Sequence, residues 1–401
     1  KILKGLSIAI TMGNVLIMQS GGSTAVLNRS LVGAIQSSFG KFDNVFGSIR
    51  GIQGLIHNNL VNLTNISEAR LSVINNTPGA FLGSTRHKII DNEIESILNH
   101  LQYNDIAACI IIGGNDSAET GHSIFNASID AGIDLSIVNI PKTIDNDLRN
   151  TDHSLGYGSA ALFVAMSTMG IGRDSESMGQ SSPIAILEVM GRDTGWLASA
   201  SILGKKDQRD APHIVVTPEY PISEDKFLDL LESAYSSFGF AVAVVSENAR
   251  SDLGVFGNNK PWFVDDFGHP YYEGAGQYLS RLASKTLGLR VRFEKPGTIQ
   301  RSLVATISKT DALEASMAGE QAIYCAKRGE TDIMVTLERS QSNPYNCVTG
   351  TTTLEKVAGK ISAMPESYFS LKDYMPTESF INYASPLIGD SLPLFERLVD
   401  M

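Results

Sequence analysis

The segment Pro141–Asp147 (PKTIDND) contains the residues best suited to chemistry. It follows an apolar run that predicts a buried strand, and it presents a lysine, a threonine and two aspartates within seven residues. Lys142 is a point charge suited to a phosphoryl group in transfer, and Asp145 can accept the proton of an attacking hydroxyl. Asp147 is then available to hold a sugar or to organise a metal ion. A solvated polar loop is the alternative, but it does not explain why a buried strand leads directly into the segment.

Three more turns follow predicted strands. Ser20–Thr24 (SGGST) opens a helix, whose amides and dipole can bind an anion, although a glycine turn there is often only geometry. Gly113–Ser117 (GGNDS) also opens a helix, and Ser117 can cap it or contact phosphate. Asp116 fits a helix cap, a magnesium ligand or a group that excludes part of a larger ligand. Arg192, in Met-Gly-Arg, can pair with a phosphate or form a surface ion pair.

The elements that must position these turns alternate between strand and helix. Repeated strand-turn-helix units predict parallel strands joined by helical crossovers, with helices on both faces of each sheet. Such sheets bind ligands at the carboxyl ends of their strands. The expected strands are Val15–Gln19, Val45–Ile49, Ile106–Ile112, Leu135–Ile140, Ile184–Val189, His213–Thr217, Phe240–Ser246 and Ile333–Leu337. Expected helices include 25–39, 116–131, 156–178, 194–203, 224–236, 274–287, 312–327 and 354–361, and residues 248–273 are expected to form a long loop.

Composition excludes several classes of protein. The 401 residues are 43% hydrophobic with 36 glycines, which fits a globular α/β protein rather than a disordered one. A net charge of −11 argues against general affinity for nucleic acid or anionic membranes. No apolar run approaches the ~20 residues of a membrane span. Three cysteines without CxxC spacing predict reduced thiols and a cytoplasmic location, and residues 1–11 are expected to be an upstream extension.

These motifs, in this order, resemble those of the 6-phosphofructokinase family. The resemblance runs from about residue 14 to about residue 340, and its most specific part is TIDND followed by Met-Gly-Arg. The motifs that carry it are Gly21-Gly22 with Asn28, Gly113-Gly114-x-Asp116-Ser117, Pro141–Asp147, Met190-Gly191-Arg192 and Gln300-Arg301.

The resemblance implies a role for each matching residue. Asp145 would take the proton from the 1-hydroxyl of fructose 6-phosphate, with Asp147 beside it and Thr143 in contact with the sugar or the transferred group. Glu219 would bind a sugar hydroxyl, and Arg86 would meet the donor phosphates together with Gly22 and Ser117. The sugar-phosphate pocket would be formed by Met190, Gly191, Arg192, Arg301 and Arg292, the last from a neighbouring subunit.

Donor choice depends on two positions. ATP-using members of the family have glycine at the places of Asp116 and Lys142. A carboxylate at 116 would crowd and repel the α-phosphate of a nucleotide, and Lys142 would supply a cation for a shorter donor. The chain is therefore similar to the pyrophosphate-dependent branch, and Thr77–Arg86 and Gly156–Ser159 also resemble that branch. The resemblance implies Mg²⁺ as cofactor, held by Asp116 and by Asn115, which stands where many members have an aspartate.

The predicted architecture is two Rossmann-like α/β/α domains with mainly parallel sheets and the active site in the cleft between them. We expect residues 1–158 with a return segment 300–401 to bind the donor, and residues 159–299 to bind the sugar phosphate. The expected reaction converts fructose 6-phosphate and pyrophosphate reversibly to fructose 1,6-bisphosphate and phosphate, in a homodimer or homotetramer. The alternatives are an ATP-dependent 6-phosphofructokinase and a non-catalytic, sugar-phosphate-binding regulatory subunit.

Overall fold

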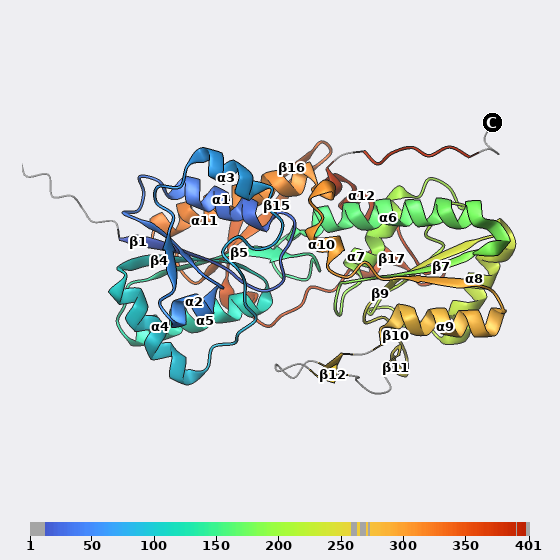
Figure 1. The fold of residues 1–401 in the computed structure, drawn as a ribbon, viewed down its shortest axis with the longest axis horizontal. Helices are drawn as coiled ribbons and strands as arrows, with labels where there is room; N and C mark the ends of the chain where they lie inside the picture. The colour runs from blue at the N-terminus through green and yellow to red at the C-terminus, as the bar shows by residue number, and fades with distance from the viewer. Residues whose placement is uncertain (1–12, 258–262, 265–269, 272, 390, 398–401) are drawn as a thin grey trace, which may run out of the picture.

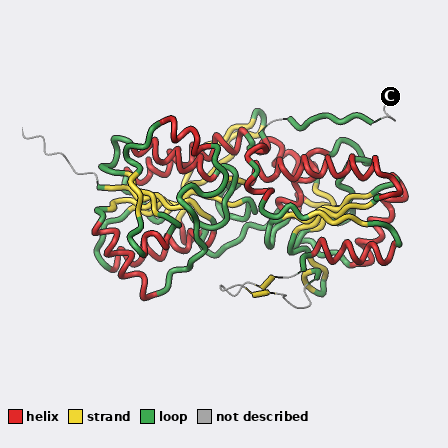
Figure 2. Tube along the Cα trace, viewed as in Figure 1, coloured by secondary structure: helices red, strands yellow, loops and turns green. Residues whose placement is uncertain are grey.

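Two α/β/α lobes lie side by side along the long axis of the molecule in the computed structural model (Figure 1). In each lobe a sheet lies between layers of helices (Figure 2). The predicted fold class is therefore confirmed. The structure describes residues 13–257, 263–264, 270–271, 273–389 and 391–397, so the expected extension at residues 1–11 lies outside the described residues.

The first lobe is built on an eight-stranded sheet in the order β16-β15-β5-β4-β1-β2-β3, with β6 paired to the end of β5. The strands from β15 to β2 are parallel, whereas β3 and β16 are antiparallel edges. Central strands such as β1 are apolar and buried along their whole length, as expected for a parallel sheet covered on both faces. The strands are β1 (Asn14–Gln19), β2 (Val45–Ser48), β3 (Leu60–Asn62), β4 (Ile106–Gly113), β5 (Ser136–Thr143), β6 (Leu155–Gly156), β15 (Ile333–Ser342) and β16 (Tyr345–Thr353).

Helices cover both faces of this sheet (Figure 1). One face packs against α1 (Leu27–Ser38), α3 (Glu68–Asn75) and α11 (Lys309–Lys327), and the other against α2 (Ile52–Ile56), α4 (Asp91–Tyr103) and α5 (Asn115–Asp130). The backbones of α1 and α11 approach closely, because a Cβ at Gly33 would lie 2.5 Å from the carbonyl oxygen of Ser316. This contact requires glycine and fixes α11, which begins beside the second lobe, to the first.

The second lobe has a four-stranded, wholly parallel sheet in the order β14-β7-β9-β8. Its strands are β7 (Ile184–Val189), β8 (Ile214–Val216), β9 (Ala241–Ser246) and β14 (Val291–Glu294). The long helix α6 (Tyr157–Met178) and α7 (Trp196–Ser199) cover one face, and α8 (Glu224–Phe238) and α9 (Ala275–Leu287) cover the other.

The chain returns to the first lobe through α10 (Ile299–Ser302) and then crosses back. Residues 364–388, which include α12 (Glu378–Ala384), pack into the core that α6 and α7 share with the second sheet. Three two-stranded ribbons complete the fold, β10 (Arg250–Ser251) with β11 (Gly254–Val255), β12 (Phe263–Val264) with β13 (Pro270–Tyr271), and β17 (Phe369–Ser370) with β18 (Met375–Pro376). The proposed domain boundaries near residues 158 and 300 remain a proposal.

Some predicted elements differ from those observed. The helix expected at 354–361 is only a 3₁₀ turn, Leu354–Lys356, since Gly359 takes a left-handed φ of 65° that breaks a helix. The helix expected at 194–203 is the short α7 followed by a 3₁₀ turn, Ala200–Gly204. The strand expected to stop at Ile140 continues to Thr143, because its end pairs with β6 after leaving β4.

Part of the loop expected at 248–273 lies outside the described residues. Among the described helices, none combines the length and the apolar character that a membrane crossing needs.

Candidate active site

Five strand ends open into one cavity of about 280 Å³ between the two sheets. The ends of β1, β4 and β5 come from the first sheet, and those of β7 and β9 come from the second. The residues that follow or end these strands line the cavity: Ser20, Gly114, Thr143, Met190 and Glu247. Because parallel strands all end at the same edge of a sheet, two such edges facing each other make one site from distant segments.

A buried ammonium group lies at the first-lobe end of the cavity. Lys142 is only 3% exposed, and its Nζ donates a hydrogen bond of 2.8 Å to the carbonyl oxygen of Gly22. Burial, and then the charge of Arg301, lower the pKa of Lys142 to about 7. An anion bound here would favour the protonated form of Lys142, since its negative charge would offset the burial and the neighbouring cations.

The side chains of two arginines, Arg301 and Arg86, lie beside the glycine turn at Gly22. A Cβ at Gly22 would overlap Nη1 of Arg301, so a larger residue there would displace the guanidinium from this position. Arg86 also lines the cavity, and its charge helps to lower the pKa of Arg301. The Nε atom of Arg301 is buried and has no hydrogen-bond partner within the described part of the chain. Three cations around a glycine turn form a site for a compact, highly charged anion.

Two buried carboxylates lie beyond the cations. Burial raises the pKa of Asp145, although Arg192 opposes the shift with its Nε 3.7 Å from Oδ2 of Asp145. Burial and the neighbouring charge of Asp145 raise the pKa of Asp147 to about 6. The hydroxyl of Thr143 accepts a hydrogen bond of 3.1 Å from the backbone amide of Asp145. Burial that raises the pKa of a carboxylate makes it hold a proton more strongly than an exposed one, which suits Asp145 to act as a general base.

The start of α5 supplies oxygen atoms beside Asp147. The amide of Asn115 is best oriented with its nitrogen donating to the carbonyls of Lys360 and Val357, at 3.0 and 3.3 Å. Its oxygen then takes the position 3.4 Å from Oδ2 of Asp147. Asp116 lies in the first turn of α5 and its charge also raises the pKa of Asp147. These oxygens suit Mg²⁺, which binds through one or two carboxylates while phosphates and water complete its shell.

Within the described chain, they do not form a metal site that protein side chains complete alone. Ser117 also lines the cavity and is almost fully buried.

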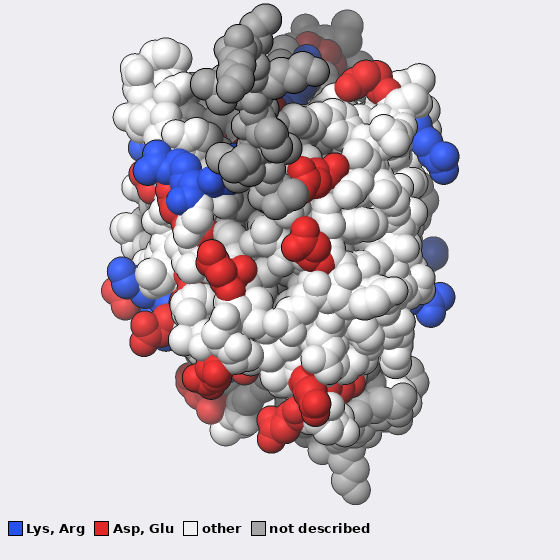
Figure 3. Space-filling view, turned by 90° about the vertical axis from the view of Figure 1, so that its left-hand side faces the viewer, with Lys and Arg blue, Asp and Glu red and all other residues white. Residues whose placement is uncertain are grey.

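The charge inside the cavity differs from the charge of the whole chain. The chain has a net charge of −11, and the outer end of the first lobe bears scattered acidic side chains with basic ones toward its margins (Figure 3). The cavity instead has more basic than acidic side chains in its lining, with Arg86, Lys88, Lys142, Arg192 and Arg301 against Asp116, Asp145, Asp147 and Glu247. This local cluster of cations supplies the positive field that an anionic ligand needs in an acidic protein.

The family model described as Phosphofructokinase matches residues 14–326. This chain belongs to the phosphofructokinase family. It is 35% identical over 397 residues to the pyrophosphate–fructose 6-phosphate 1-phosphotransferase of Rhodospirillum rubrum, covering 97% of each chain. It is 31% identical to the sulfofructose kinase of Alkalicoccus urumqiensis, over 88% of this chain and 91% of that protein. The crystal structure of a pyrophosphate-dependent phosphofructokinase from Marinobacter aquaeolei is also similar, with a TM-score of 0.86 and 30% identity over 96% of this chain and 94% of that one.

Three of the residues that the sequence predicted for the site do not line the cavity. Gly191 shapes the turn instead, since its φ is 142° and a Cβ there would lie 2.7 Å from the carbonyl oxygen of Thr194. Glu219 is held by the backbone amides of Gly195 and Met364, at 2.9 and 3.2 Å. Arg292, on the edge strand β14, pairs with Asp174 of its own chain. The predicted roles of Gly191, Glu219 and Arg292 stay predictions.

Sequence reasoning missed Glu247, which lines the cavity directly after β9. Its Oε1 accepts a hydrogen bond of 3.0 Å from the backbone amide of Arg192, and burial raises its pKa. The signal was present, because Glu247 follows a buried strand as Thr143 and Met190 do. His87 was also missed; it lines the cavity and its Nε2 lies 2.8 Å from Glu93.

Proposed function

We propose that this chain transfers a phosphoryl group between pyrophosphate and the 1-hydroxyl of fructose 6-phosphate, in a reversible reaction that gives fructose 1,6-bisphosphate and phosphate. One observation carries the proposal: a cation cluster around a glycine turn faces buried carboxylates across a single cavity. The names of the phosphotransferase from Rhodospirillum rubrum and of the Marinobacter aquaeolei enzyme support both substrates.

Asp145 is proposed as the base. It would take the proton of the 1-hydroxyl as that oxygen forms a bond to the terminal phosphorus of pyrophosphate. The bond from this phosphorus to the bridging oxygen breaks, and phosphate leaves. Asp147 lies beside it, and its pKa of about 6 leaves Asp147 mostly ionised and negatively charged at neutral pH. Most of the rate enhancement then comes from positioning and from neutralising phosphate charge.

Lys142, Arg86 and Arg301 are proposed to hold the donor. Arg301 lies against Gly22 of the donor turn, so we assign it to the phosphoryl group in transit, a role different from the 6-phosphate contact implied by the family resemblance. Asp116 supports pyrophosphate over ATP, because a carboxylate in the first turn of α5 repels a third phosphate. Ser117 and Gly22 complete this side of the site.

Mg²⁺ is proposed to bind through Asp147, Asn115 and Asp116 together with donor phosphate oxygens. When bound, the ion would neutralise phosphate charge. The acceptor would lie toward Met190, Arg192 and Glu247, in the second lobe.

The 6-phosphate of the sugar needs a further cation, since Arg192, which lines the acceptor side of the cavity, has a side chain that is 56% exposed. We propose that the partner subunit's Arg292 supplies it, which requires at least a homodimer. This contact requires Arg292 to leave Asp174, the residue with which it pairs in a single chain.

The experiment is a coupled assay of fructose 1,6-bisphosphate with purified protein, Mg²⁺, fructose 6-phosphate and either pyrophosphate or ATP. We expect turnover with pyrophosphate and at least 100-fold lower kcat/KM with ATP. Turnover with ATP alone would instead identify an ATP-dependent phosphofructokinase. Replacing fructose 6-phosphate by sulfofructose tests the acceptor that the Alkalicoccus urumqiensis relative is named for.

A further inference from the structure

Asn146 separates the two carboxylates of the site. Its φ is 57°, a left-handed conformation that asparagine adopts more readily than most residues with a side chain. Asp145 and Asp147 line the cavity, whereas the buried Asn146 does not. The turn at Asn146 therefore directs its own amide away from the cavity while both neighbours face it.

The amide of Asn146 meets Tyr383 of α12, which lies 237 residues further along the chain. Nδ2 of Asn146 donates to the Tyr383 hydroxyl at 2.8 Å, and this hydroxyl donates to the carbonyl of Asp152, also at 2.8 Å. Oδ1 of Asn146 accepts from the backbone amide of Ser154 at 2.9 Å. One hydroxyl thus joins both ends of residues 145–154, named here the carboxylate loop.

Tyr383 is itself held firmly. Its carbonyl oxygen accepts a hydrogen bond of 2.9 Å from Nη2 of Arg339, whose guanidinium lies 4.9 Å from the centre of the Tyr383 ring. The ring of Trp196 lies 5.3 Å away. Burial raises the pKa of Tyr383 well above its usual value, so the hydroxyl keeps its proton and remains a donor at every working pH.

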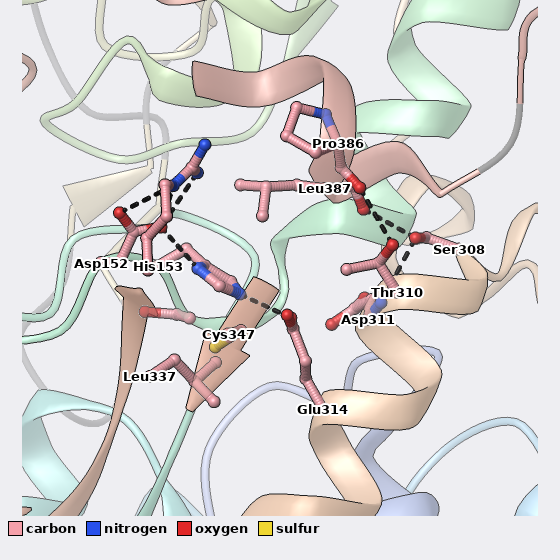
Figure 4. Close-up of polar contacts among 12 residues, drawn as sticks. Asp152, His153, Ser308, Thr310, Asp311, Glu314, Leu337, Cys347, Pro386 and Leu387 are labelled. Atoms are coloured by element: carbon pink, nitrogen blue, oxygen red, sulfur yellow. Dashed lines mark hydrogen bonds and ion pairs between the residues drawn. The ribbon is translucent and has the colours of Figure 1, made fainter. Parts of the chain in front are cut away.

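The far end of the carboxylate loop is anchored to α11 by a buried ionic chain. Figure 4 shows His153 between Asp152 and Glu314, with hydrogen bonds of 2.9 Å to Asp152 and 2.7 Å to Glu314. Arg339 lies 3.0 Å from Asp152 on its other side. Burial alone would lower the pKa of His153, but the two carboxylates raise it to about 9. The loop is therefore fixed at Asp152 and His153. At its inner end Tyr383 adds to two other bonds, in which the carbonyl of Asp145 accepts from Oγ1 of Thr194 at 3.1 Å and the carbonyl of Asp147 accepts from the backbone amide of Ser362 at 2.8 Å.

We propose that Tyr383 is a positioning residue for the phosphoryl transfer, an inference that rests on the proposed function. Its hydroxyl holds the left-handed turn at Asn146, and this turn aims the carboxylate of Asp145 at the acceptor hydroxyl. Removing the hydroxyl takes away one of the two described hydrogen bonds of the Asn146 amide and so loosens the turn, without touching either substrate. A displacement of the base by about 1 Å is enough to cost roughly 100-fold in rate.

The test is Tyr383→Phe, which keeps the buried ring and removes only the hydroxyl. We expect kcat to fall at least tenfold while the KM values for fructose 6-phosphate and pyrophosphate stay within twofold of the wild type. Hydrogen exchange of amides in the carboxylate loop should be faster in the variant and unchanged in α5. A kcat within twofold of the wild type, or unchanged exchange in the loop, overturns the proposal.

Tyr368→Phe is the matched control. Its ring belongs to the same aromatic cluster, 5.5 Å from the ring of Tyr383, and its hydroxyl makes no hydrogen bond with any described residue. This variant should keep the wild-type kcat. If it loses as much kcat as Tyr383→Phe, the effect belongs to packing and the positioning role is wrong.

Asn146→Gly tests the same link from the other side and is informative even if Tyr383→Phe folds poorly. Glycine tolerates the left-handed φ but cannot bond Tyr383, so kcat should again fall at least tenfold. Both variants remove the bond between Asn146 and Tyr383, while Asn146→Gly also removes the bond from Ser154 and Tyr383→Phe the bond to Asp152. Because the shared bond carries the positioning, the double variant should lose no more than about threefold beyond the more impaired single variant. Fully multiplicative losses would show that the two residues act independently and overturn the proposal.

The exchange measurement needs no turnover and keeps the two hypotheses separable. If the wild type is inactive with pyrophosphate, the proposed function fails while the link between Tyr383 and the carboxylate loop is still tested by exchange.

Discussion

Replacing Lys142 by methionine should remove most of the affinity for the donor in the transition state. The side chain is 3% exposed, so its charge acts through a medium with an effective dielectric constant of about 20, where a charge 4 Å away contributes about 4 kcal/mol. Because the pKa of Lys142 is about 7, only about half of the free protein carries the charged form at pH 7. Converting the rest to the charged form costs only about 0.4 kcal/mol. The net loss is about 3–4 kcal/mol, or roughly 200- to 1,000-fold in kcat/KM for pyrophosphate.

The assay measures kcat/KM for pyrophosphate at saturating fructose 6-phosphate and fixed free Mg²⁺, with circular dichroism to verify folding. Lys88→Met is the matched control, because Lys88 lines the same cavity but its side chain is 67% exposed and its Nζ lies 3.9 Å from Glu119. An exposed charge of this kind contributes about 1 kcal/mol or less, so the control should lose less than about fivefold. A loss below tenfold in Lys142→Met, or equal losses in both variants, would refute the role of the buried ammonium group.

Three more predictions concern the acceptor side and the pH dependence. Asp145→Asn should lower kcat at least 1,000-fold while isothermal titration still detects fructose 6-phosphate; unchanged turnover would favour a different base. Activity should fall as pH drops through about 6, since Asp147, whose pKa is raised to about 6, becomes protonated there, and burial raises the pKa of Asp145 as well; a flat profile down to pH 5 would contradict this. Glu247→Gln should raise the KM for fructose 6-phosphate about tenfold and leave that for pyrophosphate within twofold; the reverse pattern would place Glu247 on the donor side.

Local patterns predicted the part of the site that depends on strand ends. A buried apolar run followed by polar residues marks the carboxyl end of a parallel strand, and this rule brought Lys142 and Asp145 to the cavity without knowledge of the partner strands. The same rule would have found Glu247, had it been applied to the strand Ala241–Ser246. Glu219 was inferred from the family resemblance instead, and its carboxylate accepts hydrogen bonds from the backbone amides of Gly195 and Met364.

Contacts between distant segments could not be predicted from local periodicity. After residue 345 the sequence predicted only the helix at 354–361, which did not form. The role of this segment depends on hydrogen bonds such as that between Tyr383 and Asn146, which only the folded chain brings together. The side-chain direction of Arg301 was equally inaccessible, because it depends on the space above Gly22.

The most direct measurement is ³¹P NMR of the purified protein with Mg²⁺, fructose 6-phosphate and pyrophosphate. We expect the pyrophosphate signal to decay while orthophosphate and a second sugar-phosphate signal grow in equal amounts. Starting from fructose 1,6-bisphosphate and phosphate, pyrophosphate should appear. Release of two orthophosphates per pyrophosphate without a new sugar phosphate, or no change until ATP is added, would contradict this expectation.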